Sequence, residues 1–213
     1  MQSVKQKIIK VAEKLFFEHG IANVRLQQIA DKAGISVGHL AYYYKNKEAI
    51  VYAAYEQVFE YMSGILNTQM ELSHLTDFDI LFRAVYHLGI AFPFCFNNKW
   101  EVSRYHPDIE KKWENFSEKK LILTQQIIAF HKEKGNFKPE PYKKAYKLLA
   151  QQLQLVFHFW MPYQMLRAKP VRYALLQNHL WGLIYPHLSN KGIKEYNRLI
   201  SEKKYTISKI VLK

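Results

Sequence analysis

Residues 26–50, LQQIADKAGISVGHLAYYYKNKEAI, decide the fold, because they read as two short helices joined by a tight turn. Apolar residues recur in the first part at spacings of three and four, which is the period of one helical face. These residues are Leu26, Ile29, Ala30 and Ala33. Gly34 follows at once, where helices commonly end in a left-handed residue that glycine adopts at low cost. Ser36 is then placed to cap a second helix, and Asn46 to cap a third.

A helix, a short turn with glycine and a second helix with an exposed start are typical of the helix-turn-helix motif. The second helix of that motif enters the major groove, so it needs small side chains at its leading end and nearby donors for phosphates. The predicted leading end is Ser36, Val37, Gly38 and His39, and the predicted phosphate-binding residues are Tyr42, Tyr43 and Lys47. The alternative is an ordinary pair of short helices in an all-α protein.

The flanking sequence extends this pattern in both directions. IIKVAEKLFFEHG (residues 8–20) precedes the two helices, and KNKEAI (residues 45–50) follows them. Taken together, the segment resembles the N-terminal domain of the TetR family of transcriptional regulators. The matching residues are Ile9, Ala12, Leu15, Phe16, Gly20, Ile29, Ala30, Ala33, Gly34, Ser36, Gly38, Leu40, Tyr43, Lys47 and Glu48. The resemblance implies a DNA-binding domain followed by a helical domain that binds a small-molecule effector and a second subunit.

Three residues depart from the usual pattern of that family. Arg25 stands where Thr or Ser usually caps the second helix, and Tyr44 stands where Phe is usual. Ala41 replaces the Tyr that usually follows the leucine of the recognition helix. We expect the Ala41 change to remove one phosphate contact and lower the affinity for each half-site, while none of the three breaks the fold.

The composition favours a folded protein with a polyanionic partner. Hydrophobic residues make up 49% of the 213 residues, which is enough for a substantial core. A net charge of +13 favours nucleic acid first and an anionic membrane surface second. The first fifty residues hold eight Lys or Arg and four Asp or Glu, so +4 lies there and +9 in the remainder. Residues 191–213 are a basic stretch, predicted as a solvated tail with extra DNA contact as the alternative.

One cysteine, Cys95, excludes an internal disulfide and suits a reducing cytoplasm. It lies in the apolar run AFPFCFNN, which favours a buried, inert thiol. No signal peptide is visible, and no apolar run approaches the ~20 residues that span a bilayer. We therefore expect a cytoplasmic protein without a membrane partner.

Helical periodicity continues along the rest of the chain, and no convincing strand is present. Helices are predicted over residues 4–19, 47–72, 77–96, 107–116, 121–134, 142–166, 170–188 and 193–204. Segment 121–134 either continues the helix before it or begins another, Pro93 is expected to kink or end its helix, and Pro162 to kink its own. The fold class is all-α. The predicted domains are a DNA-binding domain over residues 1–47 and an effector-binding and dimerisation domain over residues 48–213.

The two last long helices carry more apolar surface than one neighbour can cover. The residues predicted for a dimer interface are Leu153, Trp160, Leu176, Leu180, Leu183 and Ile184. The TetR resemblance implies that such helices form a four-helix bundle with the second subunit. The alternative is that these side chains form the core of the domain itself.

Aromatic residues make up 15% of the chain and gather in its middle. Pockets for apolar small molecules are built from such side chains with a few polar groups among them. The predicted pocket residues are Phe92, Phe96, Trp100, Trp113, Phe116, Phe130, His158 and Trp160. Ordinary core packing is again the alternative.

Sequence motifs for catalysis, metals and cofactors do not stand out. The nine histidines form no HExxH pair, and no Walker A or GxGxxG sequence occurs. Residues 34–38, GISVG, match the GxSxG letters of a hydrolase, but a helix rather than a strand precedes the serine. We therefore predict no enzyme activity, no metal and no cofactor.

These observations lead to one main hypothesis and two rivals. The main one is a homodimeric repressor that binds a palindromic operator in double-stranded DNA and is released by an apolar or amphipathic small molecule. Val37, Gly38 and His39 would read bases, with help from Gln27 or Gln28 on the preceding helix. One rival is a helical carrier for an apolar ligand with a vestigial helix-turn-helix, and the other is a membrane-surface protein.

Overall fold

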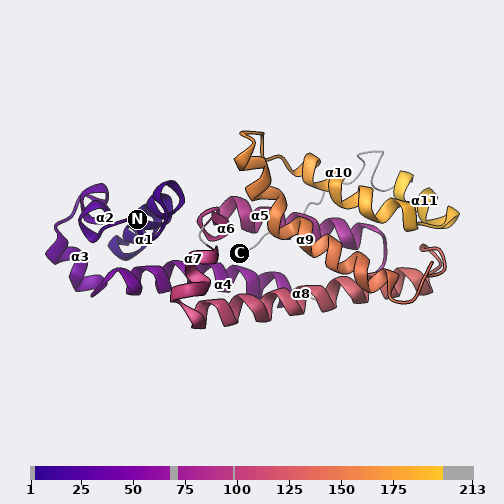
Figure 1. Ribbon diagram of the computed structural model, residues 1–213, viewed down its shortest axis with the longest axis horizontal. Coiled ribbons are helices and arrows are strands. Elements are labelled where there is room, and N and C mark those ends of the chain that lie inside the picture. The colour runs from indigo at the N-terminus through magenta and orange to yellow at the C-terminus, as the bar shows by residue number, and fades with distance from the viewer. Residues whose placement is uncertain (1–2, 68–71, 98, 199–213) are drawn as a thin grey trace. The chain divides into compact units, whose positions relative to one another are not determined.

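The computed structural model describes residues 3–67, 72–97 and 99–198, with only the backbone at residues 67, 97, 99, 100 and 103 (Figure 1). Its helices are α1 (Val4–His19), α2 (Leu26–Ala33), α3 (Val37–Tyr43), α4 (Lys47–Asn67), α5 (Thr76–Ala91), α6 (Phe94–Asn97), α7 (Lys99–Tyr105), α8 (Pro107–Glu133), α9 (Ala145–Leu166), α10 (Tyr173–Ile184), the 3₁₀ turn η1 (Tyr185–His187) and α11 (Asn190–Tyr196). In this part of the chain the only extended pairing is an isolated antiparallel bridge between Phe137 and Leu188. The predicted all-α class is confirmed.

The chain forms two compact units that do not follow a single cut in the sequence. Unit 1 comprises the described residues of Met1–Ser63 and Leu88–Asn115, and unit 2 those of Gly64–His87 and Phe116–Lys213. Helices α4, α5 and α8 each contribute residues to both units. The predicted boundary at Lys47 separates a DNA-binding domain from an effector-binding and dimerisation domain. Because the two compact units are defined by contacts and not by function, this boundary stays a prediction.

Local capping explains where the first helices begin and end. The Ser3 side chain accepts a hydrogen bond from the Gln6 N–H at 3.2 Å, which caps α1, and Gly20 ends that helix as predicted. The Asn46 side chain accepts one from the Ala49 N–H at 2.9 Å and caps α4, also as predicted. The predicted end of α4 near residue 72 falls at a gap in the description, since residues 68–71 lie outside the described part.

Several predicted helix bounds need correction in the middle of the chain. Helix α5 begins at Thr76 and ends at Ala91 before Pro93, because proline cannot continue the hydrogen-bond ladder. Asp77 lies inside its first turn rather than at the cap. Helix α8 runs through both predicted segments, 107–116 and 121–134, which confirms the alternative that the second segment continues the first, while α9 begins only at Ala145. Helix α11 begins at Asn190 instead of residue 193, and the predicted end at residue 204 lies outside the described residues.

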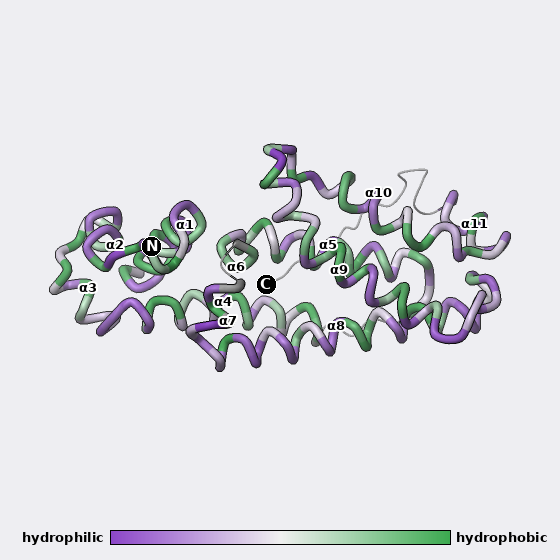
Figure 2. Tube along the Cα trace, viewed as in Figure 1, coloured by the Kyte–Doolittle hydropathy of each residue, from purple (hydrophilic) through white to green (hydrophobic). Residues whose placement is uncertain are grey.

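The core of unit 2 is made by α5, α8, α9 and α10. Helix α8 alternates hydrophobic and hydrophilic residues along its length, as expected of a helix with one covered face (Figure 2). Four residues assigned above to the dimer interface lie in this core and are only 0–3% exposed. They are Leu153, Leu176, Leu180 and Ile184. These four side chains, like Trp160 at 6% exposure, are covered within their own subunit, and the predicted dimer interface stays a prediction.

A buried carboxylate fastens α10 to α5 within the same unit. Asp79 is 1% exposed and accepts hydrogen bonds from the Arg83 Nε–H at 2.9 Å and the Tyr173 hydroxyl at 2.5 Å. Burial and the neighbouring Asp79 raise the pKa of the Tyr173 hydroxyl, so it stays a donor.

None of the described helices combines the length and the hydropathy that crossing a bilayer requires.

Candidate nucleic-acid interface

The turn between α2 and α3 has the geometry that the sequence predicts. Gly34 lies in the left-handed region, with φ 68° and ψ 37°, where a side chain would strain the backbone. The Gly34 N–H donates to the Asp31 carbonyl at 3.1 Å, and the Ile35 N–H donates to the Ala30 carbonyl at 3.1 Å. Two hydrogen bonds therefore close the end of α2 and set the direction in which the chain enters α3.

Helix α3 is held by one cap and one buried side chain. The Ser36 Oγ accepts a hydrogen bond from the His39 N–H at 3.1 Å, which confirms the predicted cap. Leu40 is 0% exposed and is the only buried residue of the helix. Val37 is half-buried, whereas Gly38 and His39 are exposed. Within its unit, the predicted leading end of α3 therefore faces outward.

Gly38 occupies a helical position that the chain itself does not require to be glycine. A Cβ added there would meet only the Ser36 Oγ, at 4.0 Å, which is an ordinary contact distance. Glycine inside a helix costs about 0.5–1 kcal/mol relative to alanine. Because nothing within the unit explains this cost, Gly38 suits the close approach of another molecule.

Three aromatic rings follow Gly38 on α3 and contact one another. The centroids of Tyr42 and Tyr43 lie 5.2 Å apart in an edge-on arrangement, and those of His39 and Tyr43 lie 5.4 Å apart. Tyr42 is 82% exposed, the second-highest value among the exposed large hydrophobic side chains. The rings of both tyrosines therefore lie on the same helix as the leading end, and their contacts with phosphates stay a prediction.

The structure gives Lys47 a role that the sequence did not indicate. Its Nζ donates to the carbonyl oxygens of Ile21 at 2.9 Å and Ala22 at 3.1 Å. These bonds hold the segment between α1 and α2 against the start of α4. An ammonium has three donors, so the predicted phosphate contact is left with the third N–H.

The two glutamines at the start of α2 also make local hydrogen bonds. The Gln28 Oε1 accepts from the Arg25 N–H at 2.7 Å, and the Gln27 Nε2 donates to the Asp31 Oδ1 at 2.7 Å. Gln28 therefore satisfies a free N–H at the start of the helix, where Arg25 provides no side-chain cap. Both glutamines are exposed, and the amide NH₂ of Gln28 is the group that remains for a base.

Lysines of α1 lie close to this surface, although the predicted site did not include them. The Lys7 Nζ is 3.8 Å from the point where Gly34 would carry a Cβ, so a cation lies beside the turn. The Lys5 ammonium lies 5.7 Å from the ring centroid of Tyr44, which is 7% exposed. Burial raises the pKa of the Tyr44 hydroxyl. Tyr44, which stands where the family usually has Phe, is therefore buried and does not break the fold, as expected.

Two family models match the chain and together cover residues 8–196. Residues 8–54 match the model described as "Bacterial regulatory proteins, tetR family", and residues 51–196 match "Bacterial transcriptional repressor". The second match alone spans more than half of the chain. The chain belongs to the TetR family.

Individual relatives agree with this assignment. The probable HTH-type transcriptional regulator YttP of Bacillus subtilis (strain 168) is 32% identical over 88 residues, which are 37% of this chain and 42% of that one. The chain spans less than half the length of the curated relatives it matches. A TetR-family regulator from Marinobacter aquaeolei VT8 has a TM-score of 0.78 at 19% identity, covering 89% of this chain and 93% of the other.

A second similar structure is that of a repressor. SmeT, the repressor of the Stenotrophomonas maltophilia multidrug efflux pump SmeDEF, aligns with a TM-score of 0.61 at 18% identity over 89% of this chain and 92% of that chain. A SmeT–triclosan complex aligns with a TM-score of 0.60. At such identities these structures establish the shared fold of this TetR-family chain.

The aromatic residues predicted to line a pocket divide between the two units. In unit 1 the rings of Phe96 and Trp113 lie 6.2 Å apart, and Phe92 lies 5.7 Å from Tyr61. The side chain of Trp100 lies outside the described part. Unit 2 holds the remaining residues of the set, namely Phe116, Phe130, His158 and Trp160.

The four pocket candidates of unit 2 differ in their surroundings. Phe116 and Trp160 are buried, at 6% exposure each, and Phe130 stacks edge-on against His131 at 5.1 Å. The His158 Nε2 lies 3.3 Å from the Ser117 Oγ, which places a polar pair between α8 and α9. A role for these residues in effector binding stays a prediction.

Proposed function

We propose that this TetR-family regulator is a homodimeric repressor that reads a palindromic operator through α3 and is released by an apolar or amphipathic small molecule. The observation that carries the proposal is the outward-facing start of α3, where Gly38 has no structural reason to be glycine. A recognition helix needs such a surface, because the DNA backbone and base edges approach it closely.

The side chains at this surface suit distinct roles on DNA. Val37 can contact a thymine methyl group, while the His39 ring or the Gln28 amide can hydrogen-bond to a purine. Tyr42 and Tyr43 would bind phosphates, which orients the helix without reading sequence. Lys7 adds a cation beside the turn. Ala41 is exposed and too short to contribute a phosphate contact.

An exposed apolar stripe on α9 supports dimerisation. Its residues recur at spacings of seven, four, four and three, so they share one helical face. They are Leu148, Leu155, Phe159, Tyr163 and Leu166, with exposures from 44% to 86%. The proposed dimer surface is this stripe together with Leu175 of α10, 38% exposed, in place of the core residues named above. A two-fold pair would present two copies of α3, as a palindrome with half-sites ~34 Å apart requires.

The proposed effector class comes from the aromatic side chains and from the family. A solved complex of SmeT contains triclosan, and SmeT is a repressor of an efflux pump. Within each unit the aromatic residues named above suit a site of the same kind, since such sites are mostly apolar with a few polar groups. Effector binding that shifts α4 would change the spacing of the two reading helices and release DNA.

Binding to DNA that flanks the protein's own gene tests this proposal. We expect the purified chain to retard a fragment with an inverted repeat and not a scrambled fragment of equal length. His39→Ala should reduce the difference between the fragments, since the other base contacts remain, whereas Glu18→Gln, an exposed change on α1, should preserve it. A folded dimer that treats both fragments alike, yet binds apolar ligands, would favour the carrier hypothesis instead.

A further inference from the structure

Eight exposed lysines gather at one end of unit 2, far along the chain from the helix-turn-helix. They come from the end of α8, the connection to α9, the first turn of α9, and α11. The set, called the basic end below, is Lys132, Lys134, Lys138, Lys143, Lys144, Lys147, Lys191 and Lys194. The proposed function leaves this charge unexplained, because α3 alone reads the operator.

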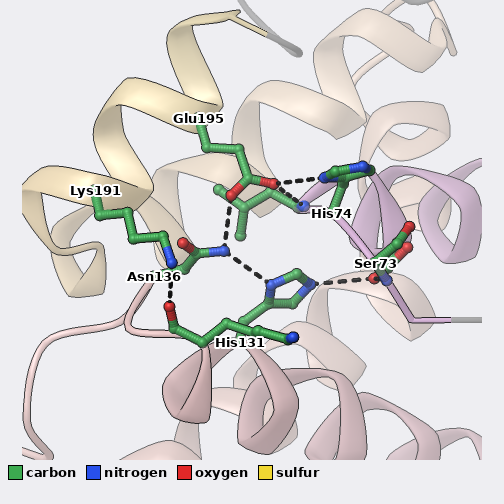
Figure 3. A network of polar contacts seen from close by, with 9 residues as sticks. Ser73, His74, His131, Asn136, Lys191 and Glu195 are labelled. Atoms are coloured by element: carbon green, nitrogen blue, oxygen red, sulfur yellow. Dashed lines mark hydrogen bonds and ion pairs between the residues drawn. The ribbon is translucent and has the colours of Figure 1, made fainter.

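Backbone contacts bring α11 against the connection between α8 and α9 (Figure 3). The Ser189 N–H donates to the Asn136 carbonyl at 2.9 Å, and the Ser189 Oγ donates to the Gly135 carbonyl at 2.6 Å. The Lys138 N–H donates to the His187 carbonyl at 2.9 Å. A Cβ on Gly192 would lie 2.1 Å from the Asn136 oxygen, so only glycine permits this close approach.

A buried polar network holds the same junction from the inside (Figure 3). The Asn136 Nδ2 donates to the Glu195 carboxylate at 2.8 Å and to the His131 Nδ1 at 3.1 Å. This leaves the ring proton of His131 on Nε2, which donates to Asp77 at 3.2 Å. Glu195 also accepts from the Leu75 N–H at 2.9 Å. The position of α11, and with it of Lys191 and Lys194, is therefore built into the fold.

The carboxylates of this region do not neutralise the lysines. Residues 131–147 and 187–196 contain eight Lys and three Glu, a net charge of +5. Glu195 is turned inward to the network, and the Glu140 carboxylate accepts a hydrogen bond from the Tyr146 N–H. Among the ion pairs of the described residues, none involves a lysine of the basic end.

We propose that the basic end is a second DNA-binding surface, which contacts the phosphates of a duplex irrespective of sequence. Eight like charges held on one folded surface attract a polyanion, and lysines bind phosphates as flexible point charges. A DNA-binding regulator also works where duplex is concentrated. The surface extends the total phosphate contact beyond what the two copies of α3 supply, so the protein stays near DNA when the operator is released.

Duplex DNA fits this surface better than an anionic membrane does. Binding in a membrane interface requires an apolar face beside the charges. In residues 131–147 and 187–196, Tyr142 is the only large hydrophobic side chain more than half exposed, at 61%. Most residues of the connection between α8 and α9 are themselves hydrophilic (Figure 2).

The test compares two triple variants of equal charge. Lys143, Lys147 and Lys194 are changed to Gln in the basic end, since the structure gives none of their ammonium groups a hydrogen bond. The matched control changes Lys111, Lys119 and Lys169, three exposed lysines elsewhere, to Gln. Fluorescence anisotropy of a labelled duplex without an inverted repeat then gives binding constants for the full chain at several salt concentrations.

We expect the basic-end variant to make the negative slope of log K against log salt shallower by about 2–3. Each lost phosphate contact removes about 0.9 from the magnitude of that slope. The control should keep the slope of the unmodified chain within about 1. Equal slopes for both variants would overturn the proposal. So would binding to vesicles of 30% phosphatidylserine, lost in the basic-end variant, with no difference between the two variants on duplex.

The result is independent of the operator hypothesis. If no operator exists, the basic end still binds the plain duplex and the two variants still differ. If the operator exists but the basic end does not bind, the inverted repeat is bound while both variants show one slope.

Discussion

Two short helices of this molecule, α3 and α11, are held in place in different ways. Each has seven residues and a serine cap, and each has one buried residue. Helix α3 inserts Leu40 into the core and otherwise relies on neighbours close in sequence. Helix α11 buries only Gly192 fully and packs the half-buried Ile193 and Tyr196 against the core of unit 2. Its Glu195 accepts hydrogen bonds from the Leu75 N–H, just before α5, and from Asn136 of the α8–α9 connection. A helix that must expose one face can thus be anchored by one fully buried apolar side chain, or by partly buried ones together with a polar network.

The largest effect should follow from removing the single anchor of α3. Leu40→Ala deletes a fully buried side chain and should destabilise unit 1 by about 2–5 kcal/mol, because a cavity adds to the lost burial. Denaturant unfolding measures the change. Tyr42→Ala, at an exposed position in the same helix, should alter stability by less than about 0.5 kcal/mol. Equal losses in the two variants would show that Leu40 is not the anchor.

The second-largest loss of stability should follow from disturbing the close contact of α11 at Gly192, with a second glycine as the matched control. Gly192→Ala forces a Cβ into the Asn136 carbonyl and should cost about 1–3 kcal/mol, since the backbone must move apart. Gly182→Ala on α10 meets nothing within 4 Å and should stabilise the protein by about 0.5–1 kcal/mol. Thermal unfolding distinguishes them by sign, and two shifts of the same sign would contradict the account.

The two units should also differ in their response to pH. Burial raises the pKa of Glu13 on α1 from 4.5 to about 7, against an opposing effect of Lys10, and its Oε1 has no hydrogen-bond partner in the described chain. The protonated carboxyl favours the folded state, so the contribution of Glu13 to stability is fully present below pH 4.5 and is lost as the pH rises through about 7.

Unfolding of the Glu13→Gln variant checks this expectation. Its stability should fall less between pH 5 and pH 8 than that of the unmodified protein, since the titrating group is gone. An identical pH profile for Glu13→Gln and the unmodified protein would show that Glu13 does not contribute to the pH dependence of stability.

The smallest change in stability should accompany a large change in DNA binding. Gly38→Ala should stabilise α3 by about 0.5–1 kcal/mol, because alanine is the better helix former. The same substitution should weaken operator binding, since the added methyl group stands where DNA approaches. Anisotropy and thermal unfolding of one variant measure both effects, and unchanged affinity would leave Gly38 without a functional reason.

The sequence predicted α3 well because its contacts are local. Gly34, Ser36 and Asn46 act on residues at most four or five positions away, so their types and spacing were sufficient. Lys47 was predicted as a phosphate donor, and its bonds to the carbonyls of Ile21 and Ala22, 26 and 25 positions away, leave no mark in a local pattern.

The sequence was less informative about unit 2 for the same physical reason. Helical periodicity shows that Leu153 and Leu180 are apolar, but not whether their own chain or a second one covers them. The contact between His131 and Asp77 spans 54 positions, and that between Asn136 and Glu195 spans 59. No spacing rule links residues so far apart, so the polar network that holds α11 required the three-dimensional structure.

The measurement that tests the central claim most directly is a base-preference profile of the purified protein on every single-base variant of its operator. We predict that His39→Ala flattens the preference at one position in each of two symmetric half-sites, by about 1–3 kcal/mol, and leaves the other positions unchanged. Uniform weakening at all positions, or a change in one half-site only, would contradict a dimer that reads DNA through the start of α3.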